Sequence, residues 1–372
     1  MVDPEVVKAM EPYFTKTYGN PSSLHSFGQE AKEALEKSRE IIAKKINAEP
    51  NEIIFTSCGT ESDNLAIKGV AYANKDKGNH IITTKIEHHA VENSCKALEK
   101  EGFKVTWLNV DKEGLINLEE LKKSITDKTI LVSIIHGNNE IGTIQDIEAI
   151  GKICKEKNVY FHTDTVQSFT KVPIDVKKQN ITLASFSAHK IHGPKGIGAL
   201  FIKKGTKIKK LNDGGSQEFN LRPGTENIPY IVGFAKAVEL AKEEECKKMA
   251  ELRDFFIQKV EKEIPEVIVN GSKEKRLCNN ANITFKYIEG EALLIRLDDK
   301  GISVSTGSAC SSRELKPSHV LTAIGLHPAM AHGSIRFSLS KFTTKDELDY
   351  TIKNVKEVVQ DLRKLSPLWG GG

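Results

Sequence analysis

From about residue 29, the chain alternates between amphipathic segments with a helical period and short segments that are apolar throughout. The amphipathic segments predict helices at residues 29–46, 61–73, 91–100, 118–125 and 147–156. The apolar segments predict strands at residues 53–55, 80–83, 105–108, 130–135, 159–161, 181–186 and 197–202. Strands that are apolar on both faces and separated by helices indicate a mostly parallel seven-stranded sheet covered by helices, which is an α/β fold.

The pattern changes after Gly233. Residues 234–260 read as one long helix, charged along one side, which predicts a connection between two lobes. Further elements are expected at residues 267–269, 281–285 and 302–304 (strands) and at 291–297 and 345–362 (helices). This mixture predicts a smaller α+β domain. We therefore expect a large domain over residues 15–248 and a small domain made of residues 1–14 and 249–372.

The composition narrows the class of protein. The 372 residues include 54 Lys and Arg against 50 Asp and Glu, and the net charge of +4 is too small and too evenly spread to indicate nucleic acid or an anionic membrane as partner. No apolar run approaches the roughly 18 residues needed to cross a bilayer. The first residues lack the basic start and apolar block of a secretory signal. The six cysteines are far apart, which favours neither a metal site nor a disulfide framework, so we expect a cytoplasmic enzyme with reduced thiols.

Polar clusters directly follow several of the predicted strands. Ligands of an open parallel sheet bind beyond the carboxyl ends of its strands, so these clusters are candidates for the chemistry. The first cluster, residues 56–62, contains Gly59 and Thr60 between a strand and a helix. Small residues there let backbone N–H groups and a helix N-terminus bind a phosphate. An ordinary helix cap by Thr60 explains the same residues, and taken alone it is the better interpretation.

Two further clusters contain a histidine and an asparagine. His88 follows the strand near residue 81, and an isolated histidine is more often a structural polar residue than a catalyst. Asn139 lies in the segment 138–142 after another strand, where amides and glycine also fit an ordinary turn. Neither cluster is informative by itself.

The last two clusters contain an acid and a lysine. Asp164 ends a strand in an apolar setting, where a carboxylate is costly unless it meets a cation. Lys190 lies among small residues ahead of a Gly-Pro turn, although most lysines are surface residues and nothing more. Together the five clusters predict a pyridoxal phosphate pocket, with a phosphate cup, a ring for stacking, an acid for the pyridinium nitrogen and a Schiff-base lysine.

Seven ordered segments closely resemble cysteine desulfurases of the NifS/IscS type, a group within the class V aminotransferase family. The segments are residues 19–23, 60–64, 138–143, 187–190, 222–227, 305–312 and 331–338. The resemblance extends from about Val2 to Trp369. It implies the fold of type I pyridoxal phosphate enzymes, a homodimer, and pyridoxal phosphate as the cofactor.

The resemblance also implies roles for individual residues. Lys190 would form the Schiff base, His88 would stack on the cofactor ring, and Asp164 would pair with the ring nitrogen. Asn139 and Arg336 would hold the substrate carboxylate, a task that suits a guanidinium because it binds carboxylates in a bidentate way. The remaining cofactor contacts would come from Gly59, Thr60, Asn139, Gln167, Ser187 and His189, and across the dimer from Thr225.

Cys310 would be the nucleophile. By resemblance, Lys190 removes the α-proton of L-cysteine, and the Cys310 thiolate attacks the substrate sulfur, leaving a persulfide on Cys310 and alanine as product. His88 would exchange protons with the sulfur. Small polar residues surround Cys310, as expected for a loop that collects sulfur and carries it to an acceptor protein. That acceptor would serve iron–sulfur cluster assembly or thio-modification.

Two other functions fit parts of the same pattern. A selenocysteine lyase would share the pocket, but the long loop with Cys310 favours a persulfide relay. Family members carry a strand ahead of the position of Met1, and without it a weakened enzyme that mainly binds sulfur-acceptor partners is expected. Lys190, Asp164 and Arg336 argue against this second alternative, because a binding protein needs none of them.

Overall fold

The structure is a computed structural model that describes residues 1–306, 317–367 and 369. The chain divides into two compact units. Unit 1 consists of Met1–Leu108, Leu118–His136 and Asp146–Lys242, and unit 2 of Asn109–Asn117, Gly137–Gln145 and Glu243–Gly372. No helix in the described part of the chain has the length and apolar character needed to span a membrane.

A seven-stranded sheet forms the centre of unit 1. Its strands are β1 (Ile53–Thr56), β2 (His80–Thr84), β3 (Lys104–Leu108), β4 (Thr129–Ser133), β5 (Tyr160–Asp164), β6 (Leu183–Ser187) and β7 (Gly198–Ile202). Their order is β1-β7-β6-β5-β4-β2-β3, and only β7 runs antiparallel to its neighbours. Five strands are buried along their whole length, as expected for a sheet covered on both faces. The predicted mostly parallel α/β fold is confirmed.

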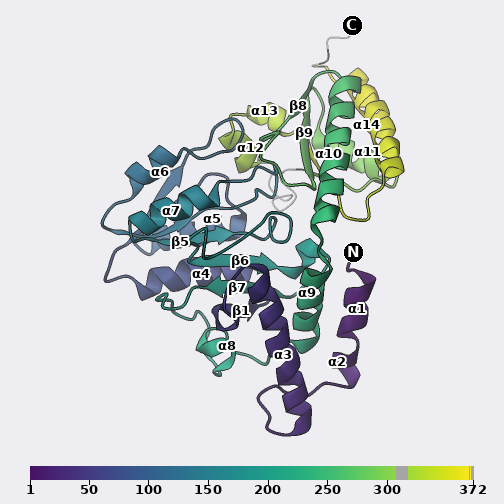
Figure 1. Cartoon of the computed structure of the whole chain (residues 1–372). Helices are drawn as coiled ribbons and strands as arrows, with labels where there is room; N and C mark the ends of the chain where they lie inside the picture. The colour runs from purple at the N-terminus through teal and green to yellow at the C-terminus, as the bar shows by residue number, and fades with distance from the viewer. Residues whose placement is uncertain (307–316, 368, 370–372) are drawn as a thin grey trace. The chain divides into compact units, whose positions relative to one another are not determined.

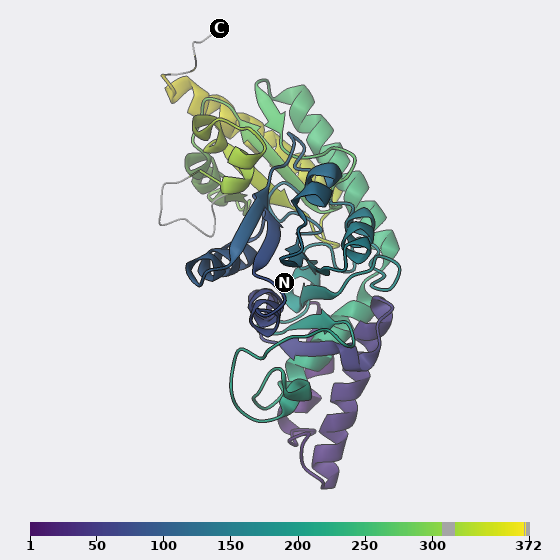
Figure 2. The ribbon, with the colours of Figure 1, turned by 90° about the vertical axis from the view of Figure 1, so that its left-hand side faces the viewer.

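Helices surround this sheet. They are α1 (Pro4–Met10), α2 (Pro12–Thr15), α3 (Ser26–Lys45), α4 (Gly59–Ala73), α5 (His89–Lys100), α6 (Leu118–Ser124), α7 (Ile147–Glu156), α8 (Gln217–Asn220) and α9 (Ile228–Leu240), with the short 3₁₀ turns η1 (Pro50–Glu52) and η2 (Ala188–Ile191). The long helix α3 lies beside α9, as both Figure 1 and Figure 2 show, and buries Ala31, Leu35 and Ile42 along one face. That spacing is the amphipathic period which predicted the helix.

The N-terminal helix α1 belongs to unit 1, whereas we expected residues 1–14 in the smaller domain. It packs against α9: Val6 is fully buried, and a Cβ on Gly233 would come within 2.6 Å of the Met10 sulfur. Asp3 caps α1 by accepting a hydrogen bond from the N–H of Glu5 (2.9 Å). The contact between α1 and α9 decides this assignment, and it joins residues more than 200 positions apart, which local periodicity does not report.

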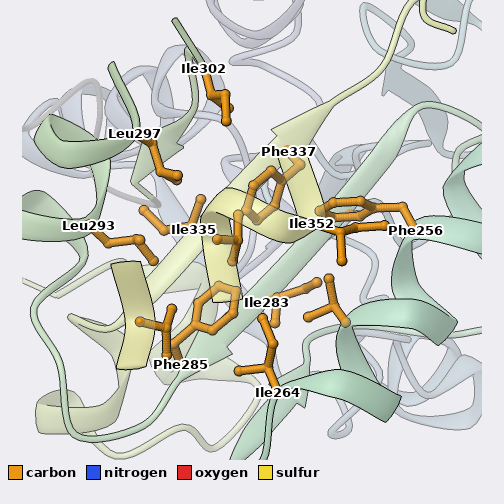
Figure 3. Packing of buried hydrophobic residues seen from close by; sticks show 14 of the residues in the cluster. Phe256, Ile264, Ile283, Phe285, Leu293, Leu297, Ile302, Ile335, Phe337 and Ile352 are labelled. Carbon is orange, nitrogen blue, oxygen red and sulfur yellow. The ribbon is translucent and has the colours of Figure 1, made fainter. Parts of the chain in front are cut away.

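Unit 2 is built around a four-stranded antiparallel sheet in the order β10-β11-β9-β8. Its elements are α10 (Glu243–Glu263), β8 (Val267–Val269), β9 (Asn280–Phe285), α11 (Gly290–Asp298), β10 (Ser305–Thr306), α12 (His319–Ala323), α13 (Pro328–Ala331), β11 (Ser334–Ser338) and α14 (Lys345–Leu365). Figure 3 shows its core, in which Ile283 and Phe337 of the sheet meet Phe256 of α10, Leu293 of α11 and Ile352 of α14. Burial of these side chains stabilises the unit through the hydrophobic effect.

Two predicted elements are wrong. The stretch predicted as one helix, residues 234–260, contains the end of α9 and most of α10, because Ala241 adopts an extended conformation (ψ 119°) between them. Neither Gly nor Pro marks this break, so the helical pattern continues across it. The strand expected at residues 302–304 is also absent from the described structure, and the short strand β10 begins only at Ser305.

Candidate active site

The candidate site of unit 1 lies where strands β4, β5 and β6 end. Asp164 is the last residue of β5, and Ser187 is the last residue of β6. His136 follows β4, and its N–H donates to the Asp164 carbonyl (2.9 Å). Because these strands are parallel, their carboxyl ends form one edge of the sheet, and the segment that carries Lys190 begins at the same edge.

The Asp164 carboxylate is an almost fully buried acid. The residue is only 4% exposed, and its Oδ1 accepts a hydrogen bond from the N–H of Val166 (2.9 Å). Burial raises the pKa of Asp164, whereas the positive charges of His88 and Lys190 lower it. The charge of this carboxylate therefore depends on cationic groups at the same edge of the sheet.

His88 occupies the N-cap position of α5. Its Nδ1 accepts a hydrogen bond from the N–H of Ala90 (3.1 Å), so the neutral ring carries its proton on Nε2. Burial lowers the pKa of His88, while Asp164 opposes this effect and Lys190 adds to it. In its neutral form the ring is therefore a donor through Nε2 next to a buried acid.

Lys190 lies in η2, the short turn that follows β6. It is exposed, and its positive charge acts on Asp164, His88 and His189. The Ser187 hydroxyl and Nδ1 of His189 are joined by a hydrogen bond (2.8 Å). Partial burial and the neighbouring lysine charges lower the pKa of His189 to about 4, so this ring is neutral at physiological pH.

Helix α4 points its N-terminus toward the turn after β5. The N-cap residue is Cys58, whose side chain makes no capping hydrogen bond, so the alternative of an ordinary cap by Thr60 is wrong. The first-turn N–H groups are available to an anion for this reason. A Cβ on Gly59 would lie 2.6 Å from the Val166 side chain, so glycine allows the helix end to approach this turn closely.

The remaining predicted residues of unit 1 lie on turns and loops. Gln167 is half-buried in the turn after β5, whereas Thr60 and Thr225 are exposed. Arg222, three residues ahead of Thr225, donates from Nε to the Glu61 carboxylate (2.9 Å) and so ties its loop to the first turn of α4. Cys310 lies outside the described residues.

Three buried residues for which the sequence predicts no role lie close to this site. Asp63 contributes a carboxylate oxygen within 4.8 Å of ligand-type atoms of His88 and Asp164, and its Oδ1 is 3.6 Å from Nε2 of His162. Burial, and next the charge of Asp164, raises the pKa of Asp63 well above its ordinary value. Burial raises the pKa of Glu87 to about 8 and lowers that of His162 to about 3.

The sequence contains a signal that Asp63 is part of a polar site. Asp63 lies on the apolar stripe of α4, four and seven residues before Ile67 and Val70, where an acid is unexpected. An acid on such a stripe is either protonated or faces a polar site. The position of this acid within the helical period therefore indicates a buried polar site next to α4.

Unit 2 contains the other two predicted site residues, Asn139 and Arg336. Nη1 of Arg336, on β11, donates to the Asn139 carbonyl (2.8 Å). Among the residues that the structure describes, Oδ1 of Asn139 and Nε of Arg336 are buried polar atoms without a hydrogen-bond partner. A bound amino acid offers both an acceptor for Nε and a donor for Oδ1, so it suits this pair of atoms.

The fold and the two groups of residues define a class of protein. A mostly parallel seven-stranded sheet with an acid and a lysine at its carboxyl edge is typical of pyridoxal phosphate enzymes of fold type I. The family model "Aminotransferase class-V" matches residues 1–351. The chain belongs to this family.

Individual relatives indicate which members of the family this chain resembles. The chain is 56% identical over 371 residues to "Cysteine desulfurase IscS" of Clostridium botulinum, which covers 98% of this chain and 94% of that protein. Its structure is similar to that of a "NifS-like protein", with 42% identity, a TM-score of 0.91 and 97% of each chain covered. It is also similar to a structure described as "SspA in complex with cysteine", with 38% identity, a TM-score of 0.83 and 92% of this chain and 97% of that one covered.

Pyridoxal phosphate is the cofactor of this family, and the residues of unit 1 fit it. The Lys190 amine suits its aldehyde, and the buried Asp164 carboxylate suits a ring nitrogen that must keep its proton. The uncapped N-terminus of α4 and the Ser187 hydroxyl suit its phosphate. The chemistry of this donor set matches the three functional groups of the cofactor.

Proposed function

We infer that this protein is a pyridoxal-phosphate-dependent cysteine desulfurase, which converts L-cysteine to L-alanine and retains the sulfur as a persulfide. The buried Asp164 carboxylate in the field of His88 and Lys190 is the observation that carries this inference. The relatives named above favour desulfurase activity over a selenocysteine lyase and over a protein that only binds sulfur acceptors.

Residues of unit 1 hold most of the cofactor. Lys190 supplies the amine for its aldehyde, Asp164 pairs with the ring nitrogen, and His88 supplies the ring for stacking. Bound there, pyridoxal phosphate supplies an electron sink for negative charge that forms at the substrate α-carbon. Further contacts come from Gly59, Thr60, Asn139, Gln167, Ser187 and His189, with Thr225 joining from a second subunit.

Lys190 and His88 move the protons of the reaction. The Lys190 amine would take the α-proton of the substrate, because it is the basic group among the residues that would hold the cofactor aldehyde. His88 exchanges a proton with the substrate sulfur through Nε2, since Nδ1 is occupied by the N–H of Ala90. The lowered pKa of His88 supports this role, because a ring with a low pKa gives up an added proton readily at neutral pH.

Arg336 and Asn139 bind the amino acid. Nε of Arg336 donates to the substrate carboxylate, while Oδ1 of Asn139 accepts from a donor of the substrate or cofactor. Both atoms are buried without a partner in the described structure, which supports this assignment. The burial matters because a charge-assisted hydrogen bond is stronger away from water.

Cys310 accepts the sulfur. Its thiolate forms a sulfur–sulfur bond as the carbon–sulfur bond of L-cysteine breaks, and the carbon that loses sulfur takes up a proton on the way to alanine. The persulfide then passes to an acceptor protein for iron–sulfur cluster assembly or thio-modification. This role rests on the resemblance of residues 305–312, since Cys310 lies outside the described residues.

A homodimer accounts for an exposed apolar surface of unit 1. Phe14, Tyr18, Leu24 and Phe27 are all exposed, Leu24 to 94%, and the rings of Tyr18 and Phe27 stack with centroids 5.7 Å apart. Monomeric proteins seldom leave neighbouring apolar residues uncovered in this way. Sedimentation of the cofactor-loaded protein measures this directly, because a dimer has twice the mass of the chain.

A reducing compartment such as the cytoplasm suits this function, because a persulfide relay needs thiols that are kept reduced. The five cysteines within the described residues form no disulfide with one another. Secreted proteins commonly oxidise cysteines to disulfides, whereas cytosolic proteins keep them reduced.

The function is tested by incubating the cofactor-loaded protein with L-cysteine and a reductant and measuring alanine and sulfide in parallel. Equal amounts of both products are expected. Without reductant, mass spectrometry is expected to find one extra sulfur on the peptide of Cys310, and Cys310→Ala is expected to abolish both persulfide and sulfide release. The matched control Cys246→Ala changes a half-buried thiol of α10 and is expected to behave as wild type. If Cys310→Ala releases sulfide at the wild-type rate, the assignment is wrong.

A further inference from the structure

Asn282 lies in the middle of β9, directly opposite Arg336 of β11. It is completely buried, with 0% of the residue exposed. Residues directly opposite in an antiparallel pair direct their side chains to the same face of the sheet, with Cβ atoms about 4.5–5.5 Å apart. The two side chains therefore act on the same neighbouring segment, Gly137–Gln145.

These two side chains hold consecutive carbonyl groups of that segment. Nη1 of Arg336 donates to the Asn139 carbonyl (2.8 Å), and Nδ2 of Asn282 donates to the Glu140 carbonyl (3.1 Å). Nδ2 of Asn280, also on β9, donates to the same Glu140 carbonyl (3.0 Å). Both acceptor positions of this carbonyl are filled by buried amides.

The Asn282 amide is itself held in one orientation. Its Oδ1 accepts a hydrogen bond from Nδ2 of Asn270 (2.7 Å), which also donates to the Thr284 hydroxyl (2.8 Å). The Thr284 hydroxyl pairs in turn with that of Ser334 on β11 (2.7 Å). A reversed Asn282 amide would turn its oxygen toward the Glu140 carbonyl, so the network directs the donor to the right place.

The segment that Asn282 holds is internally rigid. Oδ1 of Asn138 accepts hydrogen bonds from the N–H groups of Glu140 and Ile141, both at 2.9 Å. Gly142 has a left-handed φ of 76°, and a Cβ there would come within 2.6 Å of the Asn280 side chain. A rigid turn can move only as a whole. The side-chain amides of Asn280 and Asn282 on β9 hold it in one position.

We propose that Asn282 is a positioning residue that sets the distance between the Asn139 amide and the Arg336 guanidinium, and thereby the affinity for the carboxylate end of an amino acid. The proposal rests on the proposed function, because it assumes that L-cysteine binds at these two residues. Asn282 does not touch the substrate. It donates a hydrogen bond to the carbonyl of the residue after Asn139, and its strand partner Arg336 donates one to the Asn139 carbonyl. The pairing of these two strands therefore determines the spacing of both binding groups.

The test compares Asn282→Asp with a matched control, Asn354→Asp, in the cofactor-loaded protein. Asn282→Asp keeps the shape of the side chain but puts an oxygen in place of the Nδ2 donor. Asn354 is a buried asparagine of α14 in the same unit, whose Nδ2 donates to the Tyr350 carbonyl within the helix. The control therefore loses the same kind of hydrogen bond away from the segment.

For Asn282→Asp we expect KM for L-cysteine and the inhibition constant of L-alanine to rise together by about tenfold, which corresponds to ~1.4 kcal/mol. We expect kcat to stay within about twofold and its pH profile to stay unchanged. Asn354→Asp is expected to lower the melting temperature and leave both constants at wild-type values. A fall in melting temperature for Asn282→Asp without a change in KM and inhibition constant overturns the proposal.

A second variant covers the case in which Asn282→Asp does not fold. Asn270→Ala removes the donor that orients the Asn282 amide and leaves Asn282 in place, so a smaller rise of KM in the same direction is expected. An unchanged KM in folded Asn270→Ala then overturns the proposal. A wild-type protein that does not turn over L-cysteine contradicts the proposed function instead, so the two failures are distinguishable.

Discussion

The site residues of unit 1 and those of unit 2 differ in the kind of side chain that they contain. The group in unit 1 consists of titratable residues: Asp164 and His88 shift the pKa of each other, and the charge of Asp164 raises the pKa of Asp63. The group in unit 2 consists of amides and a guanidinium, which keep one charge state over the physiological range. We infer that the residues of unit 1 control protons, whereas those of unit 2 control the geometry of binding.

The largest effect on turnover is expected for Asp164→Asn, which removes the buried carboxylate of the group in unit 1. An amide cannot stabilise the proton on the cofactor ring nitrogen, so we expect kcat for cysteine desulfuration to fall about 10²–10³-fold and its pH profile to move. Steady-state assays from pH 6 to 9 check this. The exposed Asp76→Asn serves as the control. A variant that retains a tenth or more of the wild-type kcat would show that Asp164 has no such role.

An intermediate effect is expected for Arg336→Lys, which tests the unit 2 side. An ammonium keeps the positive charge but loses the paired donors of the guanidinium, so we expect KM for L-cysteine to rise about 10–100-fold. The pH profile of kcat is expected to match that of the wild type, because both side chains stay charged. A shifted pH profile would contradict the division of labour between the two groups.

The smallest effect on turnover is expected for Glu87→Gln, which removes one titratable group of unit 1. Burial raises the pKa of Glu87 to about 8, from an ordinary value near 4.5. Below pH 4.5 both folded and unfolded chains hold this proton. Between pH 4.5 and 8 only the folded chain keeps it, so the wild type loses stability as the pH rises, by roughly 5 kcal/mol over this range.

Glu87→Gln removes this titration and keeps the acceptor oxygen that binds the Thr84 hydroxyl (2.6 Å) and the Ile135 N–H (3.0 Å). Thermal unfolding at pH 5 and pH 9 measures the outcome. The melting temperature of the variant relative to wild type is expected to be higher at pH 9 than at pH 5. The same difference at both pH values would mean that Glu87 does not titrate as described.

The sequence predicts the sheet of unit 1 well because its strands are apolar on both faces and its helices carry an amphipathic period. Sequence periodicity does not report contacts between distant segments. For this reason it misplaced α1, which depends on the contact between α1 and α9. It also missed the break at Ala241, which no Gly or Pro marks.

Site residues that directly follow a strand can be predicted from the sequence. Buried residues that hold those site residues in place are much harder to predict. Asp164 and Lys190 follow strands of the sheet, so topology alone indicates the edge that they share. Asp63 and Asn282 are buried supports, and their importance depends on which side chains surround them in three dimensions. The order of polar residues along a helix or strand gives a hint of such supports, but not their partners.

We infer that Lys190 binds the cofactor next to the buried carboxyl group of Asp164. Borohydride reduction of the cofactor-loaded protein, followed by peptide mass mapping, tests it most directly because reduction makes the lysine linkage permanent. We expect one pyridoxyl phosphate group per chain, on the peptide that contains Lys190, and none in Lys190→Ala. Modification of Lys171 or Lys195 in place of Lys190, or no modified lysine at all, would contradict it.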